Sequence, residues 1–237
     1  MANKDLIFGR NPVKEAIRVN RVLKVYISSG FTDRELLQMI SDNSLPKVIK
    51  NNESLNALTS GGVHQGIVAE IKPYEYVSLD HLLYLCKDET NPIIVILDGI
   101  NDPHNMGAIL RNCDIFGVKG VVVSKHNQVM LNSTVAKTSA GAINYVPVAL
   151  VGNLNQTIQT LKDNGFWIVS ADGSGNTSYL DMDYNFPVAL VIGSEGKGIA
   201  PLILKNSDYI VKIPMHGKVN SLNASVAAGI LLAKIKE

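Results

Sequence analysis

Three polar segments of this sequence combine glycines with side chains that could bind a ligand or position a proton. They are residues 101–107 followed by Arg111, residues 192–198, and residues 219–227. Each segment stands beside an apolar run of the kind that forms a buried strand or helix. Because a fold does not need polar clusters at the ends of its strands and helices, we expect these segments to form a functional site.

The second segment has the features of a ligand-binding loop. Residues 193–198 read Gly-Ser-Glu-Gly-Lys-Gly and follow the apolar run 188–192. Glycines let backbone amides approach a bound ligand closely. The spacing matches neither the phosphate-binding GxxxxGK[S/T] loop nor the GxGxxG loop of dinucleotide-binding proteins. A lone Glu195 in such a loop has a simpler explanation as a solvated side chain.

The other two segments also have purely structural explanations. Asn105 could cap a helix, which would put Arg111 about one and a half turns further along that helix. Ser221 and Asn223 stand before a strongly apolar stretch and could cap a final helix in the same way. His104 has no partner at metal-ligand spacing, so these segments do not predict a metal site.

A regular alternation of strands and helices begins after Pro92. We expect strands at 93–97, 120–123, 166–170, 188–192 and 209–213, and helices at 106–116, 133–140, 154–164, 201–205 and 223–236. The strands are continuous apolar runs, which are typical of a parallel sheet covered on both faces. Ligands of open parallel sheets bind outside the carboxyl ends of the strands, and the three polar segments fall there or next to it.

The first 75 residues predict a smaller α/β unit. Its expected elements are a helix over 13–19 with Asn11 as cap and Pro12 at its first position, a strand over 22–28, a helix starting at Asp33, and further elements at 48–49, 53–58 and 66–71. The chain therefore divides into residues 1–75, a linker at 76–91 with a helical turn or two, and a larger unit at 92–237.

The composition is that of a globular protein with substantial cores. The chain has 237 residues, of which 46% are hydrophobic and 18% are charged. No apolar run approaches the roughly 18 residues of a membrane span, and the N-terminus lacks the layout of a signal peptide. Cys86 and Cys113 show no CxxC spacing, which argues against a disulfide framework or a zinc site. We therefore expect a cytoplasmic protein without membrane or metal partners.

Charge is unevenly distributed, although the net charge is only +1. Residues 1–50 hold nine Lys/Arg against five Asp/Glu. Such a local excess could attract a polyanion such as nucleic acid. An ordinary solvated face of a small domain explains the same excess equally well.

Taken together and in this order, the polar segments resemble the three signature motifs of the SpoU family. The matching residues are Asn105, Gly107 and Arg111 in the first segment, Gly193, Glu195 and Gly198 in the second, and Ser221, Asn223 and Ser225 in the third. The family comprises S-adenosylmethionine-dependent RNA ribose 2′-O-methyltransferases of the SPOUT superfamily. The resemblance covers residues 98–233. In addition, residues 8–16 and 62–69 resemble the family's small substrate-binding domain, which is similar to ribosomal protein L30e.

The resemblance implies a fold and a set of roles. The fold would be α/β, a trefoil-knotted SPOUT methyltransferase domain preceded by a small L30e-like α/β domain that binds RNA. The chain around Gly193, Ile213 and Leu222 would hold S-adenosylmethionine. The catalytic and positioning groups would be Asn105, Arg111, Glu195, Ser221 and Asn223. Within the family, the chain is most similar to bacterial enzymes that methylate a guanosine ribose in 23S ribosomal RNA.

Arg111 matches the residue that the family is proposed to use to activate the ribose hydroxyl. A free arginine is a poor base, because its guanidinium stays protonated in proteins. We favour a phosphate-bound Arg111 that stabilises developing alkoxide charge, with direct proton removal as the alternative. The reaction needs no metal, because the sulfonium of the cofactor already makes its methyl group electrophilic.

The resemblance also implies a homodimer, because SpoU proteins usually pair through helices of the knotted domain. The apolar final helix, residues 226–235, is longer than a solitary small core requires. Full burial of this helix within one subunit would also explain its composition.

Other functions fit the same residues. The nearest alternatives are a tRNA methyltransferase of the same family and one that confers resistance by methylating a ribosomal adenosine. A non-catalytic RNA-binding protein with this fold is a further alternative, although the joint presence of Arg111, Glu195, Ser221 and Asn223 argues against it. An unrelated nucleotide-binding α/β enzyme is less well supported, because the phosphate-loop motifs are missing.

Overall fold

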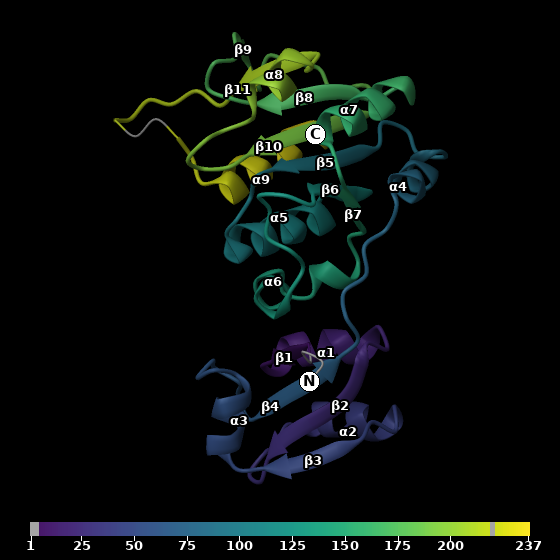
Figure 1. Ribbon diagram of the computed structural model, residues 1–237, viewed down its shortest axis with the longest axis vertical. Helices are drawn as coiled ribbons and strands as arrows, with labels where there is room; N and C mark the ends of the chain where they lie inside the picture. Colours follow the sequence, from purple (N-terminus) through teal and green to yellow (C-terminus); the bar gives the residue numbers. More distant parts are fainter. Residues whose placement is uncertain (1–4, 219–220) are drawn as a thin grey trace. The chain divides into compact units, whose positions relative to one another are not determined.

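The computed structural model describes residues 5–218 and 221–237 (Figure 1). Val219 and Asn220, which begin the third polar segment, lie outside the described residues. The chain divides into two compact units. Unit 1 contains the chain up to Glu75 together with Leu131–Asn144, and unit 2 contains Tyr76–Met130 and Tyr145–Glu237.

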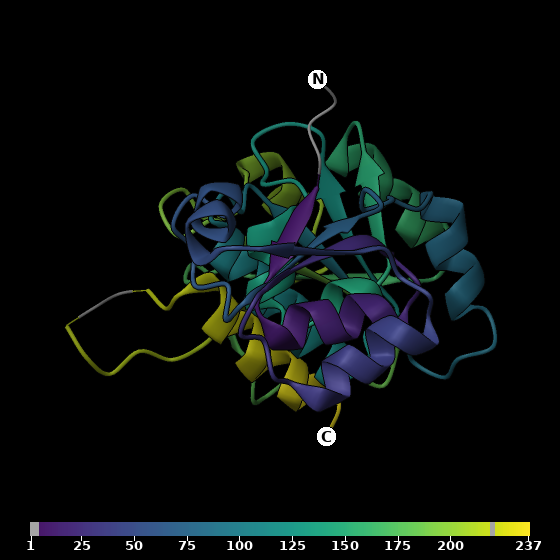
Figure 2. The same ribbon diagram turned by 90° about the horizontal axis from the view of Figure 1, so that it is seen from below.

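Unit 1 is built on a small mixed sheet with the strand order β1-β4-β2-β3. The strands are β1 (Leu6–Phe8), β2 (Val22–Ser28), β3 (Lys47–Lys50) and β4 (Ile67–Ile71), and the helices are α1 (Arg10–Arg18), α2 (Arg34–Asp42), α3 (Asn52–Leu58) and α6 (Ser133–Thr138), with the 3₁₀ turn η1 (Ala142–Asn144). Helices α1 and α2 pack side by side, as Figure 2 shows from below. On the α3 side, Tyr26, Leu55 and Val68 form a separate buried cluster.

The start of α1 differs from the expectation. The expected cap at Asn11 is wrong, because α1 already begins at Arg10 and its N-cap is Gly9, at φ 93°. The backbone N–H of Arg10 donates to Oε1 of Gln65 at 2.9 Å, so a side chain from a distant loop replaces the local cap. The expected start of α2 at Asp33 is one residue early, because α2 begins at Arg34 and Asp33 is its N-cap, which accepts a hydrogen bond from the N–H of Leu36 at 3.1 Å.

In unit 2 the described residues form a seven-stranded parallel sheet with the order β7-β6-β5-β10-β8-β11-β9. The strands are β5 (Ile93–Asp98), β6 (Gly120–Ser124), β7 (Val148–Val151), β8 (Trp167–Ala171), β9 (Thr177–Ser178), β10 (Val188–Gly193) and β11 (Tyr209–Lys212), and the helices are α4 (Leu79–Cys86), α5 (Pro103–Ile115), α7 (Leu154–Asp163), α8 (Pro201–Lys205) and α9 (Ala224–Ile235). The expected parallel α/β architecture is confirmed. Strands β7 and β9, of four and two residues, were not expected from the sequence.

Both faces of the central strands are covered. Residues from α4, α7 and α8 share one buried cluster with Ile94 and Ile96 of β5 and Ala189 and Val191 of β10. Helices α5 and α9 pack against each other (Figure 1), and Nδ2 of Asn112 donates to the carbonyl of Ser225 at 2.9 Å between them. This double coverage explains why the strands are continuously apolar.

The sheet order brings the three polar segments to one edge. Strands β5 and β10 are neighbours in parallel register, with Asp98 opposite Gly193 at their carboxyl ends. The first segment follows β5 into α5, the second follows β10, and the third lies between β11 and α9. Since parallel strands end on the same side, the segments converge there.

Residues 76–91, which we expected to be a linker, contribute to the core of unit 2. They contain α4, whose Leu82 is fully buried and whose Cys86 is nearly so. Both belong to the cluster formed with β5, β6 and β10. The N–H of Val77 also donates to the carbonyl of Val148 at 2.9 Å beside β7.

We expect Leu82→Ala to destabilise the protein by about 2–5 kcal/mol, because it leaves a cavity under α4. Tyr84→Ala on the same helix is the matched control, since Tyr84 is 62% exposed. The control should cost about 0.5 kcal/mol or less. Denaturant unfolding of the full chain measures both variants, and equal losses would contradict a core role for α4.

Candidate active site

Three side chains, one from each polar segment, meet at the carboxyl edge of the sheet of unit 2. Nδ2 of Asn105 donates to Oε1 of Glu195 at 2.9 Å. Nδ2 of Asn223 donates to Oδ1 of Asn105 at 2.8 Å and also to Oε1 of Glu195. We call these residues the amide–carboxylate cluster.

Asn105 is available to this cluster because another residue caps α5. The expectation that Asn105 caps the helix is wrong. Instead, Oδ1 of Asp102 accepts a hydrogen bond from the N–H of His104 at 2.8 Å, and Pro103 occupies the first helical position. Proline suits that position, since its missing N–H would have no helical acceptor there. The Asn105 side chain therefore sits within the first turn and is buried.

Asn223 both caps α9 and joins the cluster. Its Oδ1 accepts hydrogen bonds from the N–H of Ser225 at 2.9 Å and from the N–H of Val226 at 3.3 Å. Because backbone N–H groups can only donate, the amide orientation of Asn223 is fixed and its Nδ2 must face Asn105 and Glu195. Asn223 therefore donates to Asn105, and both amides donate to Glu195, whose carboxylate can only accept.

The glycine segment forms a tight loop after β10. The N–H of Ser194 donates to the carbonyl of Gly198 at 3.2 Å, and the N–H of Gly198 donates to the carbonyl of Ser194 at 2.8 Å. A Cβ atom added at Gly193 would lie 2.3 Å from the carbonyl carbon of Gly198, whereas one at Gly196 would meet nothing within 4 Å. Gly198 has φ 65°, a left-handed conformation that favours glycine. Glycine is thus required at 193 and 198 for steric reasons, but not at 196.

A cavity of about 560 Å³ opens at this edge of the sheet. Its lining includes all three residues expected to hold a cofactor, Gly193, Ile213 and Leu222, and also Glu195 and Ser221. The volume lies within the range of small-molecule and cofactor pockets.

The sequence did not indicate one wall of this cavity. Residues 171–173 line it at the carboxyl end of β8, as do Val211 and Lys212 of β11. Strand β8 lies between β10 and β11 in the sheet, although all three are separated along the chain. Only the strand order reveals this wall, and the sequence pattern does not fix that order.

A second cavity of about 610 Å³ is also lined by the glycine loop. It is lined by Asn105 and by residues 98–102 after β5, and it shares Ser194, Glu195 and Gly198 with the first cavity. Glu195 of the amide–carboxylate cluster therefore lines both cavities. Oε2 of Glu195 has no partner among the residues that the structure describes, which leaves it available to a ligand.

Arg111 is not brought to the cluster within one chain. It is exposed on α5 and lines neither cavity. Within residues 5–218 and 221–237 its side chain has no hydrogen-bond or ion-pair partner. Of the five expected catalytic residues, the structure joins Asn105, Glu195 and Asn223 and places Ser221 on the first cavity.

The cysteines do not add nucleophilic chemistry. Both are free and buried. Burial raises the pKa of the Cys86 thiol to about 11 and raises the pKa of Cys113 as well. Both thiols are therefore protonated at neutral pH. In the described part of the chain, no helix is long and apolar enough to cross a membrane.

The parallel sheet and the cavity beside a polar cluster at its carboxyl edge define an α/β domain with a ligand site of the kind that cofactor-dependent enzymes use. The model of the SpoU rRNA Methylase family matches residues 92–233. A second model, described as RNA 2′-O ribose methyltransferase substrate binding, matches residues 6–77. The chain belongs to the SpoU methylase family, whose members are RNA methyltransferases.

Individual relatives agree with this assignment. A putative TrmH family tRNA/rRNA methyltransferase of Staphylococcus haemolyticus is 42% identical over 97% of this chain and 94% of its own length. The putative TrmH family tRNA/rRNA methyltransferase YacO of Bacillus subtilis is 40% identical over 98% and 94%. The crystal structure of the SpoU methyltransferase AviRb from Streptomyces viridochromogenes covers 99% of this chain and 89% of its own, with a TM-score of 0.83 and 24% identity. At that identity the likeness shows the fold, a SpoU methyltransferase domain preceded by a substrate-binding domain.

We expect Gly193→Ala to lower the affinity for S-adenosylmethionine about ten- to hundredfold, because the new methyl group displaces the loop that lines the cavity. Gly196→Ala in the same loop is the matched control and should bind within about twofold of the original chain. Titration calorimetry with the cofactor measures both. Equal affinities in the two variants would contradict the steric role of Gly193.

Proposed function

We propose that this protein transfers the methyl group of S-adenosylmethionine to the 2′-hydroxyl of a guanosine ribose in 23S ribosomal RNA, in the cytoplasm. The observation that carries the proposal is the amide–carboxylate cluster, in which each of the three motifs supplies one residue. Membership of a family of RNA methylases supports the reaction class. The guanosine of 23S RNA rests on the resemblance of the sequence alone.

The first cavity fits the cofactor in size and chemistry. Ile213 and Leu222 offer apolar contact, and the backbone at Gly193 permits close approach. Asp172 and Glu195 place two carboxylates on the lining, against the single cation, Lys212, that the described residues contribute there. Negative charge near the ligand favours the positive sulfonium of S-adenosylmethionine. The AviRb structure in complex with AdoMet, with a TM-score of 0.81 to this chain, is consistent with such a site.

The cluster would position the ribose. S-adenosylmethionine supplies a methyl group that is already electrophilic, so the protein has to align the attacking oxygen and handle its proton. Oε1 of Glu195 is held by the amides of Asn105 and Asn223, and Oε2 is available to accept a hydrogen bond from a ribose hydroxyl. Alignment of reacting atoms at about 3–3.5 Å supplies a large share of the rate enhancement. Ser221, on the cavity lining, would assist at the same place.

Arg111 would act from outside this cavity. Its exposure on α5 leaves the guanidinium free to bind an RNA phosphate and to stabilise the alkoxide as it forms. Ile115, one turn further along α5, is 63% exposed, so the face that carries Arg111 is partly apolar. A homodimer that covers this face would place Arg111 against the second copy.

The exposed side chains of α9 support that homodimer. Val226 is 48% exposed, so α9 is not fully buried within one subunit. Helix α5, which carries the exposed Ile115, packs against α9. Ile115 and Val226 therefore expose apolar surface on two adjacent helices, and a second copy of the chain could bury it in a symmetric interface.

We expect light scattering to give about twice the chain mass of 25.6 kDa. Val226→Glu should shift the protein toward the monomer, because it buries an unpaired charge in the interface. Leu180→Glu is the matched control, since Leu180 is 57% exposed elsewhere in unit 2. A monomer for the unmodified chain at micromolar concentration would contradict the homodimer.

We expect Arg111→Ala to lower the methylation rate about a hundredfold or more while the affinity for S-adenosylmethionine changes only a few-fold, a loss located in the transition state. Arg111→Lys keeps the charge but loses the forked donors, and should recover only part of the rate. Single-turnover methylation and calorimetry measure the two quantities. An alanine variant that keeps most of its rate would refute the role of Arg111.

The function itself is tested with RNA from a strain that lacks the gene. Purified protein and labelled S-adenosylmethionine are added, and the RNA is digested and analysed by mass spectrometry. A methyl group on a 23S guanosine ribose supports the proposal. Methylated tRNA would favour the alternative that the names of the tRNA/rRNA relatives suggest, and a methylated ribosomal adenosine would favour a resistance enzyme. RNA that is bound but never methylated would favour a non-catalytic role.

A further inference from the structure

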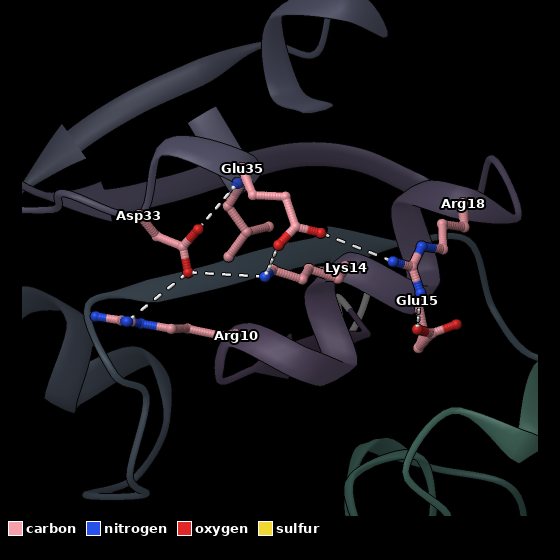
Figure 3. Close-up of polar contacts among 7 residues, drawn as sticks. Arg10, Lys14, Glu15, Arg18, Asp33 and Glu35 are labelled. Atoms are coloured by element: carbon pink, nitrogen blue, oxygen red, sulfur yellow. Dashed lines mark hydrogen bonds and ion pairs between the residues drawn. The ribbon is translucent and has the colours of Figure 1, made fainter. Parts of the chain in front are cut away.

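Part of the positive charge that residues 1–50 carry is engaged in ion pairs within unit 1. Three of its cations lie on α1 and form ion pairs with acidic residues of α1, α2 and the α2 cap. The pairs are Lys14–Glu35 at 2.5 Å, Arg18–Glu15 at 2.5 Å and Arg10–Asp33 at 3.7 Å (Figure 3). Paired cations release fewer counterions from RNA, so net charge is a weak explanation for RNA capture here.

Unit 1 has a more specific feature, an open pocket of about 530 Å³. It lies between the start of α1, the segment before α2, helix α3 and the loop 61–66. The side chains that matter for its chemistry are Arg10, Phe31, Asn56, Val63, His64 and Gln65.

A chain of hydrogen bonds fixes what Asn56 offers to this pocket. The backbone N–H of Gly66 donates to Nδ1 of His64 at 3.0 Å, so Nδ1 carries no proton. The proton of the neutral ring is then on Nε2, which lies 3.0 Å from Oδ1 of Asn56 and donates to it. The amide nitrogen of Asn56 is left with two hydrogens and no acceptor among the described residues.

Gln65 is oriented in the same way. Its Oε1 accepts the hydrogen bond from the N–H of Arg10, and this contact fixes which end of the amide is oxygen and which is nitrogen. That nitrogen also lacks a protein acceptor in the part of the chain that the structure describes. Two amide groups therefore present donors at the pocket, and their acceptor ends are both occupied.

The pocket also has a flat surface. The guanidinium of Arg10 lies over the ring of Phe31, 5.7 Å from its centroid, and the Arg10 side chain is 47% exposed. Val63, 70% exposed, adds an apolar side chain to the lining. Unpaired RNA bases stack on arginine planes and aromatic rings of this kind.

The loop that carries His64 and Gln65 is held in one conformation. Gly66 has φ 80°, and a Cβ there would lie 2.8 Å from Oγ of Ser28 and 3.1 Å from the ring of Phe31. Gln65 itself has a left-handed backbone conformation, with φ 52°. The donors are thus positioned before any ligand arrives, which reduces the ordering cost of binding.

We infer that this pocket receives an unpaired nucleotide of the substrate RNA, stacks its base on Arg10, and reads a base edge that carries two acceptors. The O6 and N7 atoms of guanine form such an edge. The inference rests on the proposed function, because it assigns a recognition site for the same RNA.

Asn56→Asp tests the donor. The aspartate keeps an oxygen for Nε2 of His64 but replaces the free NH₂ group by a second acceptor. We expect the KM for the substrate RNA to rise about tenfold, with kcat and cofactor affinity unchanged. Ser41→Asp is the matched control, since Ser41 is exposed in unit 1 and outside the pocket and adds the same charge. A rise in KM no larger than that of Ser41→Asp would overturn the inference.

Arg10→Lys and cross-linking test the stacking. The lysine keeps the charge but loses the plane, so KM should rise without a change in the salt dependence of RNA binding. Substrate RNA transcribed with 6-thioguanosine should cross-link on irradiation to peptides containing Phe31 or residues 61–66, and cross-links confined to unit 2 would overturn the site. If the unmodified protein methylates no RNA, the proposed function fails instead. If it methylates RNA and neither variant changes KM, only the pocket assignment fails.

Discussion

The carboxylate of Glu195 accepts hydrogen bonds from the amides of Asn105 and Asn223, which stand 90 and 28 residues away from it in sequence. The cluster is directional, because the backbone of α9 occupies the oxygen of Asn223 and forces its nitrogen toward the site. A site built in this way is pre-organised, since the carboxylate cannot turn away without leaving two donors unpaired. The same contact also links the start of α5, the loop after β10 and the start of α9.

The cluster depends in turn on the sheet. Asp98 and Gly193 end adjacent strands at the same level, so the loops that follow them start side by side. Oδ2 of Asp98 accepts a hydrogen bond from the N–H of Ala200 at 2.7 Å, which closes the far end of the glycine loop onto β5. The fully buried strands beneath leave little freedom for this edge to shift. Core packing and site geometry are therefore coupled in this domain, and a substitution under β5 or β10 would affect both.

The sequence predicted most of the longer strands and helices, but not details that depend on distant partners. The strand 22–28 and the helix 201–205 have the expected bounds, because apolar runs and a first-turn proline are local signals. The caps of α1 and α5 were predicted wrongly. At α1, the side chain of Gln65, which belongs to a distant loop, accepts the hydrogen bond that a local cap would accept. At α5, Asp102 rather than Asn105 caps the helix. The wall at residues 171–173 depends on strand order. The trefoil knot and the role of Arg111 stay predictions.

Unit 1 shows why a count of charges is a poor guide to recognition. Three of its cations, Arg10, Lys14 and Arg18, join α1 to α2 and its cap through ion pairs with Asp33 and Glu35, so their effect on a distant polyanion is reduced. Exposed pairs of this kind contribute little stability each and weaken with salt. What distinguishes the surface is instead the set of amide donors whose acceptor ends are occupied, beside an exposed guanidinium plane. Recognition by fixed donors and stacking depends less on salt than recognition by phosphate contacts, because it releases few counterions. The two modes can therefore be separated by their dependence on ionic strength.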